Sequence, residues 1–173
     1  MSSTTPGTFR RGIRIGIDVG SVRVGVARTD PDGVLAVPVA TLARPGSASA
    51  PRADLAALVD LVAEFEPLEI VVGLPLGLDG AEGAAATAAR SYARDLLATL
   101  RERGWTLPVR LLDERLSTTQ ATRSLRAAGR DSRSGRAVVD QAAAVIIVQH
   151  ALDSERATGT PPGALIEPVE DPS

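Results

Sequence analysis

The chain has 173 residues, 44% of them hydrophobic, and a formal net charge of −2. This suits one globular domain with a hydrophobic core and argues against a protein that coats nucleic acid through bulk charge. The chain has no cysteine, which excludes disulfides, thiolate metal sites and a cysteine nucleophile. With neither a leader pattern nor an apolar run as long as a membrane span, we expect a cytoplasmic protein outside the membrane.

The predicted elements begin with a β-hairpin. Over residues 13–18, isoleucines alternate with Gly16 and Asp18, so the two sets point to opposite faces of a strand. Residues 22–29 repeat the alternation after a Gly-Ser turn, which predicts an antiparallel partner strand. Asp18 therefore lies on the face away from the isoleucines.

The rest of the chain predicts a third strand and then alternating helices and strands. The third strand covers 34–42, and its Pro38 indicates a bulge or an edge position. Further elements are expected as a helix over 54–66, a strand over 68–75, a helix over 84–103, a strand over 108–115, a helix over 118–128, a loop over 129–136 and a helix over 137–156.

This order predicts an α/β protein of a specific type. Three antiparallel strands followed by two parallel strands with crossover helices resemble the ribonuclease H-like fold, with a five-stranded mixed sheet flanked by helices. We expect a flexible segment over 1–11, a single domain over 12–156 and a disordered, proline-rich acidic tail over 157–173.

Acidic residues occur at three ends of predicted elements. Asp18 ends the first strand, Asp113 and Glu114 end the fifth, and Asp140 lies near the start of the last helix. Each alone is more commonly a solvated residue or a helix cap. Sites in α/β proteins collect at the carboxyl ends of strands, so Asp18 could meet one of the pair at 113 and 114. Because neighbouring strand residues face opposite ways, periodicity does not say which.

Three converging carboxylates would repel one another unless a divalent cation neutralised them. Oxygen ligands without histidine or cysteine suit Mg²⁺ or Mn²⁺ rather than zinc. Two such ions can activate water and stabilise the leaving oxygen during displacement at phosphorus, which is nuclease chemistry.

Four motifs resemble the YqgF/RuvX family in order and spacing. They are GIDVGSVRVGVA (16–27), VVGLPLGLDG (71–80), DERLST (113–118) and VDQAAAVIIVQ (139–149), within a match over about residues 12–152. The family is described both as Holliday junction resolvase-like and as a nuclease of pre-16S ribosomal RNA. The resemblance implies a ribonuclease H-like fold with Asp18, Glu114 and Asp140 as catalytic metal ligands, and a structural role for Asp113. The chain departs from the family at Gly77 and Leu78, where asparagine and methionine are common.

Arginines are the candidate substrate contacts. From Glu114 to Arg136 the chain has six arginines against two acids, although a solvated helix face is an equally good explanation. The candidates are Arg23, Arg115, Arg130, Arg133 and Arg136. Arg23 fits a phosphate contact or a salt bridge, and Arg115 fits a phosphate contact or a brace for the strand end. The other three lie in a segment that corresponds to a basic loop in the family, and arginine can bind phosphate bidentately.

The sequence thus predicts a divalent-metal-dependent endonuclease acting on structured nucleic acid, either pre-16S ribosomal RNA or a four-way DNA junction. A junction would favour a homodimer with paired sites, whereas processing of an RNA end needs only a monomer. The alternatives are a catalytically silent nucleic-acid-binding or ribosome-assembly module and an actin-like phosphotransferase. The last normally needs two domains of this kind.

Overall fold

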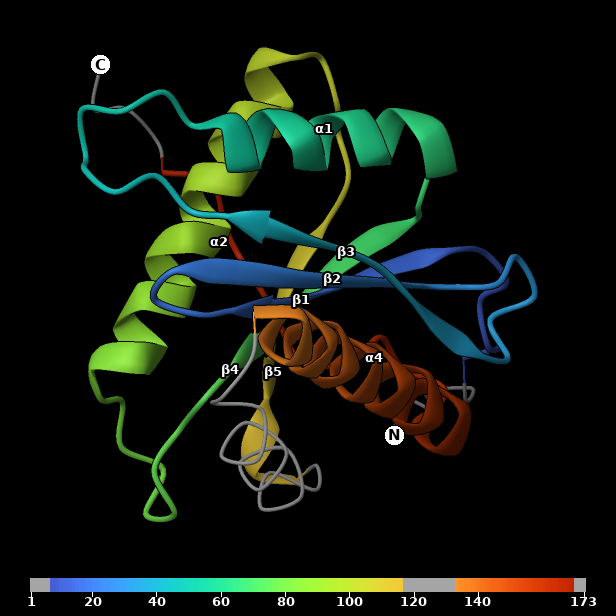
Figure 1. The fold of residues 1–173 in the computed structure, drawn as a ribbon. Coiled ribbons are helices and arrows are strands. Elements are labelled where there is room, and N and C mark those ends of the chain that lie inside the picture. Colours follow the sequence, from blue (N-terminus) through green and yellow to red (C-terminus); the bar gives the residue numbers. More distant parts are fainter. Residues whose placement is uncertain (1–6, 117–132, 170–173) are drawn as a thin grey trace.

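A computed structural model describes residues 7–116 and 133–169, with the backbone alone for Leu116 and residues 133–136. A six-stranded sheet lies between helices, in the order β3-β2-β1-β4-β5-β6 (Figure 1). The strands are β1 (Arg14–Val19), β2 (Arg23–Thr29), β3 (Ala36–Ala43), β4 (Glu69–Leu74), β5 (Val109–Asp113) and β6 (Ala164–Leu165). The first three are antiparallel, and β1, β4 and β5 are parallel, as the sequence predicted.

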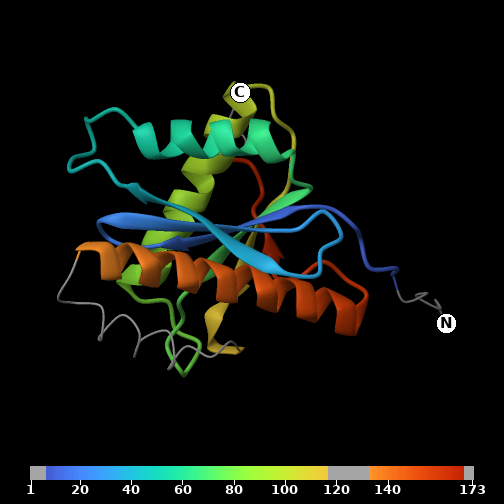
Figure 2. The same cartoon turned by 45° about the vertical axis from the view of Figure 1, so that its right-hand side comes forward.

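The helices form a layer on each face of the sheet. They are α1 (Ala53–Phe65), α2 (Ala84–Glu102), the short 3₁₀ helix η1 (Glu114–Leu116) and α4 (Arg133–Thr158). Figure 2 shows α4 along one face and α1 with α2 on the other. In the described ranges, no helix has both the length and the apolar character needed to cross a membrane.

The predicted number of strands was wrong, because the sheet has six strands rather than five. The sixth, β6, pairs antiparallel with β5 and lies within the predicted disordered tail. The chain leaves α4 at Thr158, runs back along β5 and buries Ile166 in the main core. A two-residue strand between prolines has no periodicity, so only its partner strand reveals it.

Three further sequence predictions concern a helix, a loop and Pro38. The helix expected over 118–128 lies outside the described residues. Residues 133–136, expected within a loop over 129–136, belong to α4, which begins at Arg133. Pro38 does lie on an edge strand, and it pairs with Ala27 next to a register shift at which β3 has one extra residue, Val39. The strand therefore has both features that the proline indicated, an edge position and a bulge.

The two faces of the sheet are packed differently. On the α1 and α2 face, branched residues such as Ile15, Ile17 and Val72 join the main core. On the α4 face, smaller clusters pack Ala27 against Ala144 and Val148, and Val71 against Ile147. The small residues let α4 approach the sheet closely, and this face carries the candidate site.

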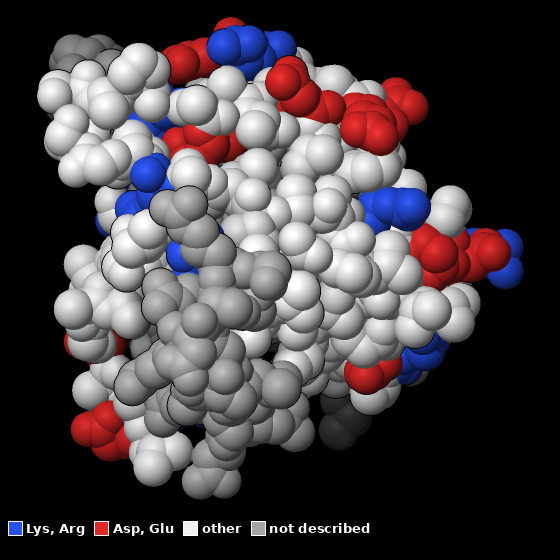
Figure 3. All heavy atoms as spheres, in the orientation of Figure 1, with Lys and Arg blue, Asp and Glu red and all other residues white. Residues whose placement is uncertain are grey.

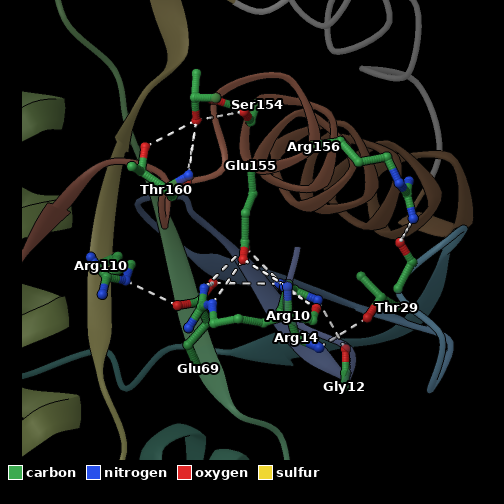
Figure 4. A network of polar contacts seen from close by, with 12 residues as sticks. Arg10, Gly12, Arg14, Thr29, Glu69, Arg110, Ser154, Glu155, Arg156 and Thr160 are labelled. Carbon is green, nitrogen blue, oxygen red and sulfur yellow. Dashed lines mark hydrogen bonds and ion pairs between the residues drawn. The ribbon is translucent and has the colours of Figure 1, made fainter. Parts of the chain in front are cut away.

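A buried charge network occupies one end of the α4 face (Figure 4). Arg14 and Glu69 begin β1 and β4 and are fully buried, and Glu155 near the end of α4 is 1% exposed. Arg14 Nη2 donates to Glu155 Oε2 at 2.9 Å, and Arg10 Nη2 donates to Glu69 Oε1 at 3.0 Å. Arg110 Nε donates to the other oxygen of Glu69 at 2.9 Å. The network therefore links β1, β4, β5 and α4 at the end of the sheet away from Asp18.

Candidate active site

Asp18 lies in β1 on the face covered by α4. Gly16, two residues earlier on the same face, is so close to α4 that a Cβ there would lie 2.6 Å from Val148 Cβ. The predicted facing of Asp18 is therefore correct, yet its side chain is only 4% exposed because α4 covers this face. Burial in a region of low dielectric strengthens every electrostatic interaction that the carboxylate makes.

Glu114 approaches the same part of the sheet from β5. Leu112 pairs with Gly73 of β4, and Glu114 follows two residues later as the first residue of η1. Its Oε1 occupies the space in which a Cβ on Gly73 would lie. Ile17 pairs with Val72 in the parallel β1–β4 ladder, so Asp18, one residue on, lies beside Gly73. Asp18 and Glu114 thus converge on one glycine.

Asp113 is directed away from this site and binds Arg115. Arg115 donates to it from the backbone N at 2.9 Å and from Nη2 at 2.6 Å. The hydrogen bond from the Arg115 side chain lowers the pKa of Asp113, so the carboxylate stays ionised. The Arg115 guanidinium also packs against Gly80, where a Cβ would lie 2.9 Å from Nη1. Arg115 therefore braces the end of β5 against the turn that follows β4.

Asp140 comes from α4 and lies over the neighbouring strand. Its backbone oxygen fills the space in which a Cβ on Gly25 of β2 would lie, and Gly25 pairs with Asp18 across the hairpin. Arg23 Nε donates to Asp140 Oδ2 at 2.9 Å. The two side chains are 31% and 15% exposed, so this ion pair is partly open to solvent.

The side chain of Thr41 in β3 holds the same part of α4 in place. Thr41 Oγ1 donates to the backbone oxygen of Ala137 at 2.9 Å. It accepts a hydrogen bond from Gln141 Nε2 at 3.1 Å. The backbone around Asp140 is thus fixed relative to β2 and β3 before any ligand arrives.

The acids share a face but do not form a compact cluster. Within residues 7–116 and 133–169, no three or more Asp, Glu, His or Cys side chains are close enough together to hold one metal ion. Arg130 lies outside the described residues, and Arg133 and Arg136 lie in the first turn of α4, where the backbone alone is described. Of the five predicted arginine contacts, Arg23 and Arg115 therefore have observed side-chain partners.

Sequence reasoning missed the glycines that create the space for this site. Gly16, Gly25 and Gly73 lie on the α4 face of three adjacent strands, and each leaves room for an atom of α4 or for Glu114. A glycine inside a strand weakens the strand and commonly marks a close approach of another group. That signal was present in the strand patterns.

Comparison with known proteins gives the family. The RuvX family model, described as "Holliday junction resolvase", matches residues 12–154. The chain belongs to the RuvX family. Its relatives include a Streptomyces coelicolor protein named "Putative pre-16S rRNA nuclease", 51% identical over 161 residues that cover 93% of this chain and 92% of the relative. A Nocardioides protein with the same name is 50% identical, over 92% of this chain and 99% of the relative.

The fold of this RuvX-family chain is also found in a solved structure. "T. thermophilus RuvC in complex with Holliday junction substrate" matches with a TM-score of 0.51 at 17% identity, over 87% of this chain and 99% of that chain. At this identity the match concerns the fold alone, and it confirms the ribonuclease H-like architecture predicted from the element order.

The donor chemistry of the site suits a hard divalent cation. The residues that face α4 around Gly73 and Gly25 offer carboxylate oxygens, which Mg²⁺ and Mn²⁺ prefer. Asp18 in β1 and Glu114, directly after β5, flank β4, and Asp140 lies over Gly25 of β2, on the other side of β1. The acids therefore suit such a cation in the type of ligand atom and in lying on the same side of the sheet. The Asp140 carboxylate, however, is engaged by Arg23.

Proposed function

We propose that this protein is a cytoplasmic, divalent-metal-dependent endonuclease that hydrolyses phosphodiester bonds in structured nucleic acid. The observation that carries the proposal is the convergence of Asp18 and Glu114 on Gly73. Asp18 of β1 lies beside Gly73, the Glu114 carboxylate lies against that glycine from the end of β5, and α4 brings a third acid, Asp140, over the next strand. Such a set of oxygen ligands suits phosphoryl chemistry assisted by Mg²⁺ or Mn²⁺.

Each acid has a distinct task in this proposal. Asp18, Glu114 and Asp140 hold the cation, which when bound supplies an activated water and stabilises charge at phosphorus. Asp18 is sheltered by α4, which keeps bulk water away from its carboxylate. Glu114 is positioned by Gly73, since the glycine leaves space for its carboxylate against β4.

Arginines near the site are the proposed phosphate contacts. In Figure 3, arginine atoms gather beside the β1–β2 turn, whereas acidic atoms predominate on α1. Arg23 lies at the start of β2, and Arg115 follows Glu114 directly. Together with Arg130, Arg133 and Arg136, they would provide a local positive charge in an acidic chain.

The relatives favour ribosomal RNA as the first substrate to examine. Proteins about half identical over nearly the whole chain are named for pre-16S rRNA. The description of the family supports a four-way DNA junction as the second candidate. A junction enzyme should act as a homodimer with two sites, whereas a monomer suffices for an RNA end.

One experiment tests the function and separates the substrates. The purified protein is given a pre-16S rRNA fragment, a four-way junction or a plain duplex, each with Mg²⁺ or with chelator, and the products are resolved on denaturing gels. We expect Mg²⁺-dependent cleavage of the rRNA fragment or the junction and little cleavage of the duplex. Asp18→Asn should abolish cleavage and leave the circular dichroism spectrum unchanged.

Other results would support the rival functions. Binding without cleavage of any substrate would favour a silent assembly module. Transfer of phosphate from ATP to an acceptor would favour the phosphotransferase. Full activity in a folded Asp18→Asn protein would remove Asp18 from the proposed site.

A further inference from the structure

The ion pair between Arg23 and Asp140 presents a conflict within the proposed site. A carboxylate that is to hold a divalent cation is here engaged by a guanidinium, with Arg23 Nε 2.9 Å from Asp140 Oδ2. The arginine carries the same sign of charge as the cation and lies against the same carboxylate. Arg23 and the cation must therefore compete for Asp140 or repel one another across it.

The surroundings of the pair allow an exchange of partners. The backbone at Asp140 is fixed by its contact with Gly25 and by the bonds of Thr41 to α4, so the helix need not move. Arg23 is 31% exposed, and its long side chain can turn towards solvent. A partly exposed ion pair also contributes little net stability, so its loss costs the fold little.

We propose that Arg23 is the resident counter-ion of Asp140 and that a divalent cation displaces it, which frees the Arg23 guanidinium for a substrate phosphate. This inference rests on the proposed function, because it takes Asp140 as a metal ligand. Arg23 is then a positioning residue before the cation binds and a substrate contact afterwards.

Binding of Mn²⁺ without nucleic acid gives the first test. Isothermal titration calorimetry at fixed pH compares the wild type with Arg23→Gln, which removes the competing charge. We expect Arg23→Gln to bind Mn²⁺ about tenfold more tightly, since one neighbouring unit charge has been removed. Arg23→Lys keeps the charge and should bind about as the wild type does. If Arg23 instead only orients Asp140, Arg23→Gln will bind Mn²⁺ equally or more weakly, and the inference is overturned.

Matched variants control this test. Arg28→Gln removes the same charge from the same strand, where Arg28 stacks on Phe65 at 4.8 Å, and should leave Mn²⁺ binding unchanged. Combining Arg23→Gln with Asp140→Asn should cancel the gain, because no carboxylate remains to be released. A persisting gain would contradict competition at Asp140. Unchanged Mn²⁺ affinity in both Asp18→Asn and Asp140→Asn would instead overturn the proposed metal site itself.

Binding of nucleic acid gives the second test. The nucleic acid that the cleavage assay identifies as the substrate is used intact, and its affinity is measured by fluorescence anisotropy. One measurement is made in chelator and one in Ca²⁺, which is a hard cation like Mg²⁺. In chelator, Arg23 is engaged by Asp140, so Arg23→Gln should bind like the wild type. In Ca²⁺, the variant should bind about fivefold more weakly, since one phosphate contact is lost. An equal loss in both conditions would show a permanent phosphate contact and overturn the exchange.

Discussion

The two ends of the α4 face both hold charged side chains, but they hold them differently. At the amino end of β1 and β4, Arg14, Glu69 and Glu155 are at most 1% exposed. At the carboxyl end, the Arg23–Asp140 pair is 31% and 15% exposed. The same helix serves both ends, with Asp140 and Glu155 separated by about 22 Å along its axis. Loss of a partner in the fully buried set would leave an uncompensated charge in the interior, whereas a partly exposed side chain can turn towards solvent.

The two ends of the sheet therefore make different contacts with α4. Here the amino end and the carboxyl end are those of β1 and β4, so Glu155, near the end of α4, lies at the amino end. At the amino end, burial opposes ionisation of Glu155, but hydrogen bonds from Arg10 and Arg14 outweigh it and lower its pKa to about 2. This end locks α4 to the sheet. Near the carboxyl end, glycines on the strands leave space for Glu114 and for the backbone of Asp140. Side-chain chemistry at this end can change while the helix stays in place.

The largest expected effect is loss of nuclease activity when an acid at the carboxyl end of the sheet is replaced. Glu114→Gln should reduce the Mg²⁺-dependent rate to below about one-thousandth, with a nearly unchanged unfolding free energy. Asp113→Asn is the matched control, since Asp113 faces away and binds Arg115 in a partly exposed pair. It should change the rate by less than about tenfold. Equal losses in a gel-based cleavage assay would contradict the assignment of Glu114 over Asp113.

The amino end should show the opposite pattern. Glu155→Gln removes the carboxylate that pairs with Arg10 and with fully buried Arg14, which then keeps only its longer ion pair with Glu69, so the free energy of unfolding should fall by about 3 kcal/mol. Asp32→Asn breaks the exposed pair with Arg11 and should cost less than about 0.5 kcal/mol. Urea unfolding measures both. At temperatures where Glu155→Gln remains folded, its cleavage rate should match that of the wild type; a large loss would show that the two ends are coupled.

Two glycine substitutions distinguish the helix from the side chain at the carboxyl end. Gly25→Ala places a Cβ against the Asp140 backbone, which moves only with α4, so it should cost about 1–3 kcal/mol. Gly73→Ala meets the Glu114 and Ile147 side chains, which can turn aside, so it should cost less stability but lower the cleavage rate. Gly46→Ala meets nothing within 4 Å and serves as the control. Thermal unfolding with parallel rate measurements checks the ranking, and equal stability of all three variants would contradict it.

The smallest expected effect is a pH dependence at the amino end. Because the pKa of Glu155 is lower in the folded state than its ordinary 4.5, its contribution is complete above about pH 4.5. It declines as the pH falls towards about 2, where the folded protein also binds the proton. The difference in urea midpoint between the wild type and Glu155→Gln should therefore shrink over this range. A difference independent of pH would argue against an ionised Glu155.

Part of the candidate site could be predicted from the sequence because successive side chains of a strand point to opposite faces of the sheet. The facing of Asp18 follows from the isoleucine pattern, and the structure bears it out. The choice between Asp113 and Glu114 came from family resemblance rather than from periodicity. The structure separates the two through the pairing of Leu112 with Gly73, which is a contact between strands.

What the sequence by itself determined is the local periodicity: the strand alternation, the order of strands and helices, and thus the ribonuclease H-like class. Only the tertiary structure decided that α4 buries Asp18, that Glu114 shares Gly73 with it, and that Arg23 holds Asp140. The same holds for β6 and for the buried pairing of Arg14 with Glu155, 141 residues apart in the chain. Local patterns report which face a side chain takes, whereas burial and pairing depend on segments that are distant in sequence and meet only when the sheet and α4 pack together.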